Sequence, residues 1–470
     1  MSFATTETRP VGFWALVKTA LSGEQKDFTS GSLKRALFML ALPMILEMVM
    51  ESLFAVVDVF YVSRISVNAV ATVGLTESVM MLIYAIAVGL SMAATAFVAR
   101  RAGEKDFHAA ANAAVQALYL AILIAIPLSI AGFIFAEDIL RLMGGSEELI
   151  RQGMHFTRIQ LGAHVVIMLL FLNNAIFRGV GDAAIAMRVL WLANILNMVL
   201  GPIFIFGLGP IPALGVTGAA VATSLGRGIG VIYQFYNLFS KRSIIRITRS
   251  DLSFKPAMVA QMLRVSFGGM SQFLIHSASW VLMVRILSTF GSSAVAGYTI
   301  AIRVIIFTIL PSWGLANAAA TLVGQNLGAK QPERAEKSVW AAAYYNMLFL
   351  TTVSIIFFTL APQIVGIFSH EPEVLRNGVL CLRIICLGYV FFAYGMVIGQ
   401  SFNGAGDTKT PTYMNLICFW VVQIPVAYIL AKVLQIGPAG VFAAQAIAFS
   451  LVAIIGILLF RRGKWKLVKV

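Results

Sequence analysis

The sequence predicts an all-α membrane protein with twelve transmembrane helices in two pseudo-symmetric six-helix lobes. Three observations predict this fold: the composition, the length of the apolar runs, and a motif that recurs at a fixed spacing. Of the 470 residues, 59% are hydrophobic and only 12% are charged, whereas roughly 25% are charged in soluble domains. In hydrocarbon only helices and closed barrels satisfy every backbone polar group, and long uninterrupted runs favour helices over the short alternating strands of a barrel.

Twelve apolar runs, each bounded by glycine, proline or charge, are long enough to cross a bilayer, which takes about 20 residues. They lie at 36–62, 69–98, 110–136, 152–177, 183–206, 214–239, 258–288, 294–324, 338–360, 375–402, 411–433 and 438–460.

The net charge of +15 is concentrated in short loops and tails, which indicates topology and anionic lipid rather than a nucleic-acid partner. With the N-terminus inside, the cytoplasmic segments hold 25 Lys and Arg residues. The outer loops hold five: Arg64, Arg141, Arg151, Arg376 and Lys432. The positive-inside rule therefore predicts a multi-pass protein with both termini cytoplasmic, and we expect it in the cell inner (plasma) membrane.

The same pattern predicts the domain organisation. Residues 1–33 form a cytoplasmic N-terminal tail, 34–240 the N-lobe, 241–257 a basic cytoplasmic linker, 258–462 the C-lobe and 463–470 a cytoplasmic tail. No cleavage site follows the first residues, so we expect no secretory signal. Residues 13–21 have helical apolar spacing, which fits a short interfacial helix or a frayed tail. The three cysteines form no CxxC or Cys/His cluster, so neither a disulfide nor a metal site is expected.

An internal repeat relates the two halves. The segment 177–182, Phe-Arg-Gly-Val-Gly-Asp, recurs at 402–407 as Phe-Asn-Gly-Ala-Gly-Asp, a spacing of 225 residues. The same spacing maps Gly103 onto Gly328 and Lys105 onto Lys330. Because each half has an even number of spans, the repeat is parallel. Such two-lobed folds are typical of transporters, in which substrate binds between lobes that rock to alternate access.

The first span carries three carboxyl groups, Glu47, Glu51 and Asp58. At 100° per residue they share one stripe, which extends over roughly 16 Å of helix axis. Ionisable groups inside a membrane are costly and usually face a cavity or an ion pathway. The alternative is that one of them, Asp58 above all, lies among the lipid headgroups.

The repeat maps Glu47 onto Gln272 and Glu51 onto His276. His276 could face Glu51 and share its charge or a proton, or it could be a core histidine bonded to Ser277 or Ser279. We expect Gln272, Asn174 and Asn194 to line the substrate cavity or the lobe interface. The carboxyl groups could carry protons, or they could bind sodium together with asparagines in the spans, which include Asn173 and Asn197. Such asparagines also commonly form hydrogen bonds between neighbouring transmembrane helices.

Other polar groups in the chain are interpreted as structural. Glu77, His164, Arg285 and Arg303 also fall in spans, where snorkelling or pairing is the default. The Gly-x-Gly-Asp segments are interpreted as turns in which glycine allows a tight backbone and Asp caps the next helix. The apolar and aromatic spans suit a cavity for amphiphilic, often cationic, organic molecules, although composition alone does not define a substrate.

Several local sequences resemble the multidrug and toxic compound extrusion (MATE) exporters over about residues 30–465. The resemblance rests on Ala-Leu-Pro at 41–43, on Asp58 within 54–60, on the 178–182 turn, on 218–223 and on 404–411. It implies efflux of drugs and metabolites by antiport with H⁺ or Na⁺, with Asp58 central to coupling. It also implies that the substrates are small organic molecules and that no cofactor is needed beyond the coupling ion. The protein is expected to be a monomer in the bilayer.

The chain departs from the family pattern at two positions. Asn197 resembles the family asparagine of the fifth helix, but Gly201 stands where an aspartate usually follows, and His276 replaces a common glutamate. The resemblance places a possible Na⁺ site near Asp58 and Asn197, which Gly201 leaves incomplete, and Glu47 and Glu51 could compensate. The predicted coupling residues are thus Glu47, Glu51, Asp58, Asn197 and His276.

Three other functions compete with antiport. A flippase for lipid-linked or polysaccharide precursors is the nearest, although such proteins often have fourteen spans and cationic cavities. A passive channel would show no counterflow. An enzyme would need a catalytic cluster at the cytosolic edge, and none is visible, so we expect a transporter rather than an enzyme.

Overall fold

The computed structural model describes residues 12–24, 27–240 and 243–470. The first half comprises α1 (Phe13–Ser22), α2 (Leu33–Ser63), α3 (Val67–Gly103), α4 (Phe107–Ile134), α5 (Ala136–Leu142), α6 (Glu147–Gly162), α7 (His164–Val180), α8 (Ala183–Phe206) and α9 (Val216–Phe239). The second half comprises α10 (Pro256–Ser288), α11 (Ser292–Gly328), α12 (Pro332–Gly366), α13 (Pro372–Leu387), α14 (Tyr389–Gly404), α15 (Lys409–Asn415), which continues through a π-helical stretch, α16 (Ile424–Tyr428) and a second π-helical stretch to Val433, and α17 (Pro438–Arg461).

All twelve predicted spans coincide with helices, which confirms the all-α membrane fold. Among the described residues, ten helices are long and apolar enough to cross a membrane, counting α6 and α7 as one. The pair α13 and α14, bent by 59°, adds an eleventh. The remaining predicted span is α9, a 24-residue helix that is not among these because polar residues such as Arg227 and Gln234 interrupt it.

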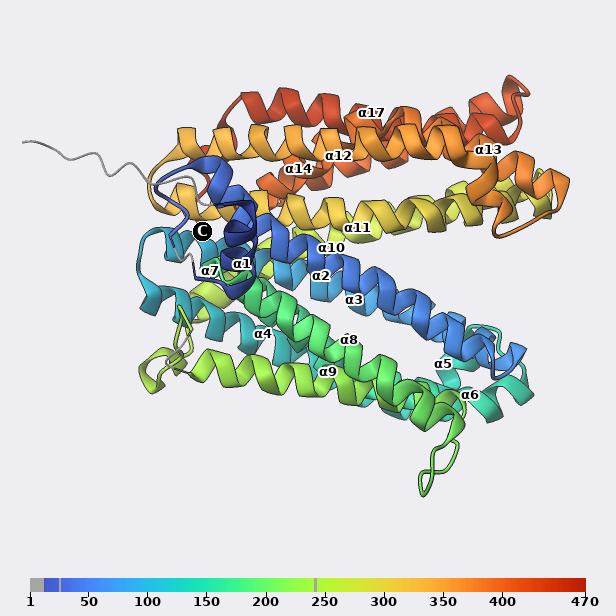
Figure 1. The fold of residues 1–470 in the computed structure, drawn as a ribbon, viewed down its shortest axis with the longest axis horizontal. Helices are drawn as coiled ribbons and strands as arrows, with labels where there is room; N and C mark the ends of the chain where they lie inside the picture. The colour runs from blue at the N-terminus through green and yellow to red at the C-terminus, as the bar shows by residue number, and fades with distance from the viewer. Residues whose placement is uncertain (1–11, 25–26, 241–242) are drawn as a thin grey trace, which may run out of the picture.

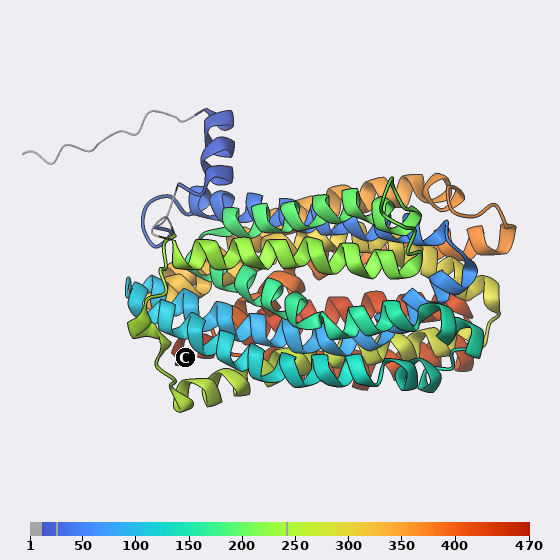
Figure 2. The same ribbon diagram turned by 90° about the horizontal axis from the view of Figure 1, so that it is seen from below.

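The helices form two lobes that touch along α2, α3, α10 and α11 (Figure 1). The turned view shows the same elongated bundle, with α1 projecting from one end (Figure 2). The C-terminus lies at that end, which we call the terminal end. Away from it the lobes diverge (Figure 1). Residues 1–11 and 25–26 of the predicted tail, and Lys241 and Arg242 of the predicted linker, lie outside the described residues.

The backbone of the two lobes repeats with the spacing found in the sequence. The break between α6 and α7 falls at Ala163, and the bend between α13 and α14 falls at Gly388, 225 residues later. Lys105 and Lys330 both adopt left-handed backbone, with φ of 60° and 58°. Few non-glycine residues take up such angles, so their recurrence at the same spacing shows that the duplication extends to individual turns.

Glycines bring the lobes together at the terminal end. A Cβ atom on Gly103 of α3 would collide with the backbone of Gln325 on α11, and one on Gly328 of α11 would collide with the backbone of Arg100 on α3. The two contacts are equivalent under the repeat. Glycine is therefore required at both places for the backbones to approach, and α3 and α11 meet closely at this end.

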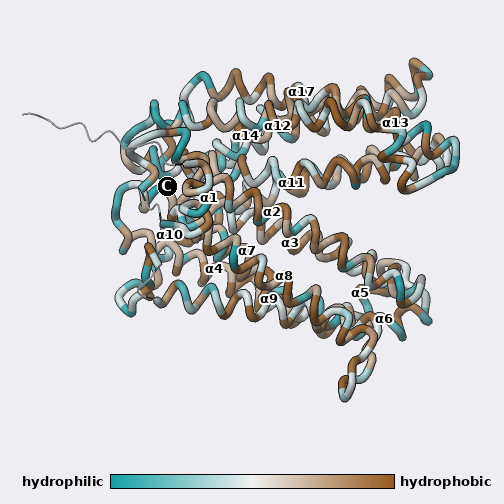
Figure 3. Tube along the Cα trace, viewed as in Figure 1, coloured by the Kyte–Doolittle hydropathy of each residue, from teal (hydrophilic) through white to brown (hydrophobic). Residues whose placement is uncertain are grey.

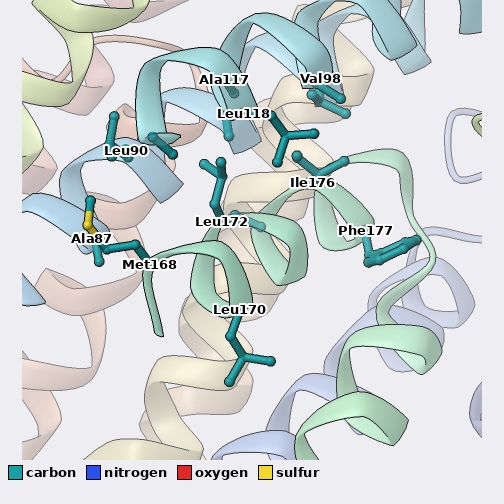
Figure 4. Close-up of a cluster of buried hydrophobic side chains, with 14 of the residues drawn as sticks. Ala87, Leu90, Val98, Ala117, Leu118, Met168, Leu170, Leu172, Ile176 and Phe177 are labelled. Atoms are coloured by element: carbon teal, nitrogen blue, oxygen red, sulfur yellow. The ribbon is translucent and has the colours of Figure 1, made fainter. Parts of the chain in front are cut away.

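Apolar clusters fill both lobes, and one of them joins α2 of the N-lobe to α11 and α12 of the C-lobe. In the N-lobe, residues of α3, α4 and α7 interlock, among them Leu90, Leu118 and Phe177 (Figure 4). Hydropathy along the chain is highest in the middle of the helices and falls toward both ends (Figure 3). The predicted helix at residues 13–21 is confirmed as α1, and its Phe13 ring lies 6.2 Å from that of Phe38 on α2.

Candidate functional site

A cavity of about 730 Å³ lies between the lobes. Along α3 its wall runs from Gly74 to Thr95, which corresponds to about 32 Å at 1.5 Å per residue. The N-lobe contributes Glu47 and Glu51 from α2 to this wall, and the C-lobe contributes α10, α11 and α14. Two of the three members of the acidic stripe of α2, Glu47 and Glu51, therefore face a chamber shared by both lobes.

Glu47 lies at the centre of a buried hydrogen-bond network. Its Oε1 accepts from Arg178 Nη1 at 2.7 Å and from Asn174 Nδ2 at 3.0 Å, both from α7. Gln234 of α9 in turn donates to Asn174 Oδ1 at 2.7 Å. The side chains of Glu47 and Arg178 are only 2% and 11% exposed, so this ion pair is shielded from water far more than a surface pair.

Glu51, one turn further along α2, has its own cationic partner. Arg227 Nη2 of α9 lies 3.7 Å from Glu51 Oε1, and Asn194 Nδ2 of α8 donates to Oε2 at 3.1 Å. Arg227 is buried, with its guanidinium 5.5 Å from the centre of the Phe54 ring. It also donates to the Tyr84 hydroxyl at 3.5 Å. One arginine thus joins α2, α3 and α9.

Asp58, the third member of the stripe, is half-buried and interacts electrostatically with Arg227 and with Glu77 of α3. The predicted partner Asn197 is buried elsewhere: its amide donates to Thr223 Oγ1 at 2.7 Å. Gly201 faces the ring of Tyr61. The structure therefore places a guanidinium near Asp58, while the Asn197 amide is occupied by α9.

The C-lobe has neutral counterparts of these groups. Gln272 exchanges hydrogen bonds of 3.0 and 3.1 Å with Asn403, and these positions are equivalent to Glu47 and Arg178 under the repeat. His276 packs edge-on against Phe419 at 5.0 Å, equivalent to Glu51 with Asn194. Equivalent helices therefore make equivalent contacts in the two lobes, but in both pairs of contacts the charged residues belong to the N-lobe.

The structure brings together most of the predicted site. Glu47, Glu51 and Asn174 line the cavity, Asn194 bonds Glu51, and Gln272 bonds the cavity residue Asn403.

His276 is placed differently from both hypotheses. Its ring forms a cluster with those of Phe419 and Phe449, and no hydrogen bond to Glu51 is formed among the described residues. Ser279 instead donates to the Phe419 carbonyl and to Gln423. The proposed pairing across the lobes is thus not a contact in this conformation, and a coupling role for His276 remains a prediction.

Sequence reasoning missed the two arginines. Arg178 belongs to a segment interpreted as a structural turn. The turn is confirmed in both lobes, since Gly181 and Gly406 have φ of 94° and 88°. The predicted Asp cap is confirmed in the C-lobe, where Asp407 accepts from the Thr410 N–H at 3.1 Å, but Asp182 makes no side-chain cap hydrogen bond to the described residues of α8. Arg227 could have been found as a charge in the middle of the run 214–239. A buried arginine needs an acidic partner, and the α2 stripe supplies one.

Two helical lobes around a shared cavity with membrane-buried ion pairs define a membrane transporter. Comparison with known proteins specifies the class. The family model MatE matches residues 43–203 and 269–429, one segment in each lobe. The chain belongs to this family of multidrug efflux transporters, and it is not an enzyme.

Relatives share the chain over nearly its whole length. The probable multidrug resistance protein NorM of Thermotoga maritima is 28% identical, covering 92% of this chain and 93% of its own. A protein of Shewanella oneidensis named FAD transporter is 25% identical over 86% of this chain and 89% of its own. A solved multidrug resistance MATE transporter in an outward-facing conformation has a TM-score of 0.87 and 28% identity, covering 96% of this chain and 98% of its own.

Proposed function

We propose that the protein is a secondary active antiporter that exports organic, cationic or amphiphilic compounds in exchange for H⁺ or Na⁺ by alternating access. The observation that carries this proposal is the pair of buried contacts Glu47–Arg178 and Glu51–Arg227 at the wall of a cavity shared by both lobes. Charges of this kind are expensive to keep inside a membrane, and they are retained where ions or protons move.

The pairs supply a way to exchange cations. A carboxylate can be neutralised by its arginine, by the coupling ion or by a cationic substrate, but not fully by all of them together. Binding of one cation therefore weakens binding of another, which is the negative coupling that antiport requires. We assign this role to Glu47, Glu51 and Asp58, with Asn197 and His276 as further coupling residues.

The proposal includes either H⁺ or Na⁺ as the coupling ion. Among the described residues no group of three or more His, Cys, Asp and Glu side chains could hold a metal ion. A sodium site near Asp58 and Asn197 would therefore depend on amide, hydroxyl or backbone oxygens, which Na⁺ also accepts. Proton exchange needs only the carboxyl groups.

The cavity favours cationic substrates over anionic ones. Its wall contains three carboxyl groups and one arginine, Arg178, which is already paired. Aromatic side chains of both lobes, including Phe171, Trp280 and Trp313, complete the wall and could stack on planar organic cations. A flippase for lipid-linked precursors, the alternative function, would need free basic groups to bind phosphate. A substrate such as FAD, which the name of one relative mentions, would need them for the same reason.

The orientation follows from the charge asymmetry of the loops. We propose that the terminal end is cytoplasmic, in the inner membrane, and that the protein functions as a monomer. In that orientation the lobes diverge toward the outside, so the structure corresponds to the state that releases exported substrate.

Transport in liposomes tests the function. Purified protein should accumulate ethidium against its concentration gradient when a pH gradient or a Na⁺ gradient is imposed. Each ion is applied alone, so the same experiment identifies the coupling ion. Absence of accumulation with both ions would exclude antiport, and equal movement with and without a gradient would indicate a passive channel.

A further inference from the structure

One carboxyl group of the cavity has no part in the ion pairs described above. Glu77 of α3 lies in the wall and is exposed to the cavity. Glu47 and Glu51 each have a guanidinium nitrogen within 4.0 Å. Within the part of the chain that the structure describes, Glu77 is the only wall carboxyl group without such a partner, so its charge is available to a mobile cation.

The nearest compensation for Glu77 comes from the opposite lobe. It interacts electrostatically with Arg303 of α11, which is exposed and stands seven residues before Leu310 and fourteen before the wall residue Asn317. Seven residues are almost two full turns, so Arg303 lies on the cavity-facing side of α11. The two charges attract each other but form no ion pair among the described residues.

The surroundings of Glu77 suit an organic cation rather than a hydrated metal ion. Tyr84 follows it by seven residues on the same face of α3, and its ring lies 5.9 Å from that of Phe171. Phe273, Trp280 and Trp313 line the same cavity from the C-lobe. A cavity whose wall holds both a carboxylate and several aromatic faces has the groups that recognise alkylated or aromatic ammonium ions.

A second unsatisfied group lies in the wall of the same cavity. Glu47 Oε2 is buried and has no hydrogen-bond partner, while Oε1 takes both the Arg178 and the Asn174 contacts. A buried oxygen in this state costs free energy until a donor reaches it.

We propose that Glu77 is the substrate-binding carboxylate of the transporter, holding the cationic group of an aromatic or alkylated organic cation against the aromatic wall. This inference rests on the proposed export of organic cations. Glu77, without an arginine partner, selects the charge of the substrate, and the bound cation still opposes binding of the coupling ion at Glu47 and Glu51 through their shared cavity.

Equilibrium binding to the purified full-length protein tests the proposal without any gradient. Ethidium serves as the cationic probe and Nile red as a neutral aromatic probe of similar size. Glu77→Gln should weaken ethidium binding by about tenfold, the loss of one charge-assisted contact, and leave Nile red binding unchanged. Glu77→Asp, which retains the charge, should lose less. Glu373→Gln removes an exposed carboxyl outside the cavity, at the start of α13, and should bind both probes as the wild type does.

The outcomes separate this inference from the function beneath it. Unchanged ethidium affinity in Glu77→Gln would overturn the inference, as would an equal loss of both probes, which would indicate a structural role. A wild-type protein that binds ethidium but accumulates none under a gradient would contradict antiport and leave the Glu77 result standing. Failure of the wild type to bind ethidium would overturn both.

Discussion

The two lobes share equivalent turns and helix contacts but differ in chemistry. Glu47 with Arg178 in the N-lobe occupies the positions of Gln272 with Asn403 in the C-lobe, and both pairs are buried and hydrogen-bonded. Glu51 with Asn194 corresponds to His276 with Phe419. The fold therefore needs a contact between these helices but does not need charge there. The charge is specific to the N-lobe, which is why we assign coupling to it.

The largest effect should come from removing a coupling carboxyl. Glu51→Gln leaves Arg227 without its anion and removes a cation-binding group, and Asp58→Asn removes a second. We expect gradient-driven ethidium accumulation in liposomes to fall at least about tenfold in each. Expression should persist in Glu51→Gln because Arg227 keeps its interactions with Asp58 and the Tyr84 hydroxyl. Wild-type rates in both variants would show that coupling lies elsewhere, and loss in His276→Gln alone would shift it to the C-lobe.

Breaking the N-lobe pair should also cost stability. Arg178→Met leaves Glu47 buried without its counter-charge, which typically destabilises by about 3–5 kcal/mol. Unfolding of the purified protein in detergent would show this as a lower midpoint. Because Glu47→Gln combined with Arg178→Met removes both charges, the double variant should recover most of the loss; a double variant as unstable as the single one would mean that Arg178 acts through packing.

The equivalent change in the C-lobe should cost much less. Asn403→Ala removes one partner of Gln272, which retains its bond to the Thr408 carbonyl at 3.1 Å. No charge is stranded, so we expect a loss of about 1–2 kcal/mol. The same unfolding measurement compares it with Arg178→Met, and equal losses in the two lobes would remove the distinction drawn between them.

The smallest effect concerns the segments that precede each lobe. Burial opposes ionisation of Asp251, but hydrogen bonds from the Thr248 hydroxyl and N–H hold its pKa below the usual value. A hydrogen bond from Thr29 outweighs burial and lowers the pKa of Asp27 to about 2. Because both folded pKa values lie below the unfolded ones, the stabilisation is present above about pH 4 and is lost as the pH falls through the folded values.

Asn substitution should reveal this difference between the two segments. The Asp251 side chain is 6% exposed and that of Asp27 is 43% exposed, so solvent weakens the Asp27 contacts more. We expect Asp251→Asn to destabilise by roughly 1 kcal/mol at pH 7 and Asp27→Asn by less. Unfolding midpoints followed from pH 7 to pH 2 should approach those of the wild type as the pH falls through the folded pKa values; a constant difference would point to packing.

Hydropathy and the repeat were sufficient to predict the lobes, because burial in lipid imposes long apolar runs and duplication preserves spacing. Helical periodicity also predicted that Glu47 and Glu51 share a face. It could not predict which side chains meet that face, since Arg178, Asn194 and Arg227 come from three other helices. Asn197 illustrates the same limit. The sequence places it within the span 183–206, but its hydrogen bond to Thr223 depends on packing between α8 and α9.

Converting the N-lobe pair into its C-lobe counterpart tests the central claim most directly. The variant Glu47→Gln with Arg178→Asn reproduces the amide pair seen at Gln272 and Asn403, so the contact between helices can persist without charge. We predict a folded protein that still binds ethidium but no longer accumulates it in liposomes under a pH or Na⁺ gradient. Wild-type accumulation by this variant would contradict the assignment of coupling to the charged pairs of the N-lobe.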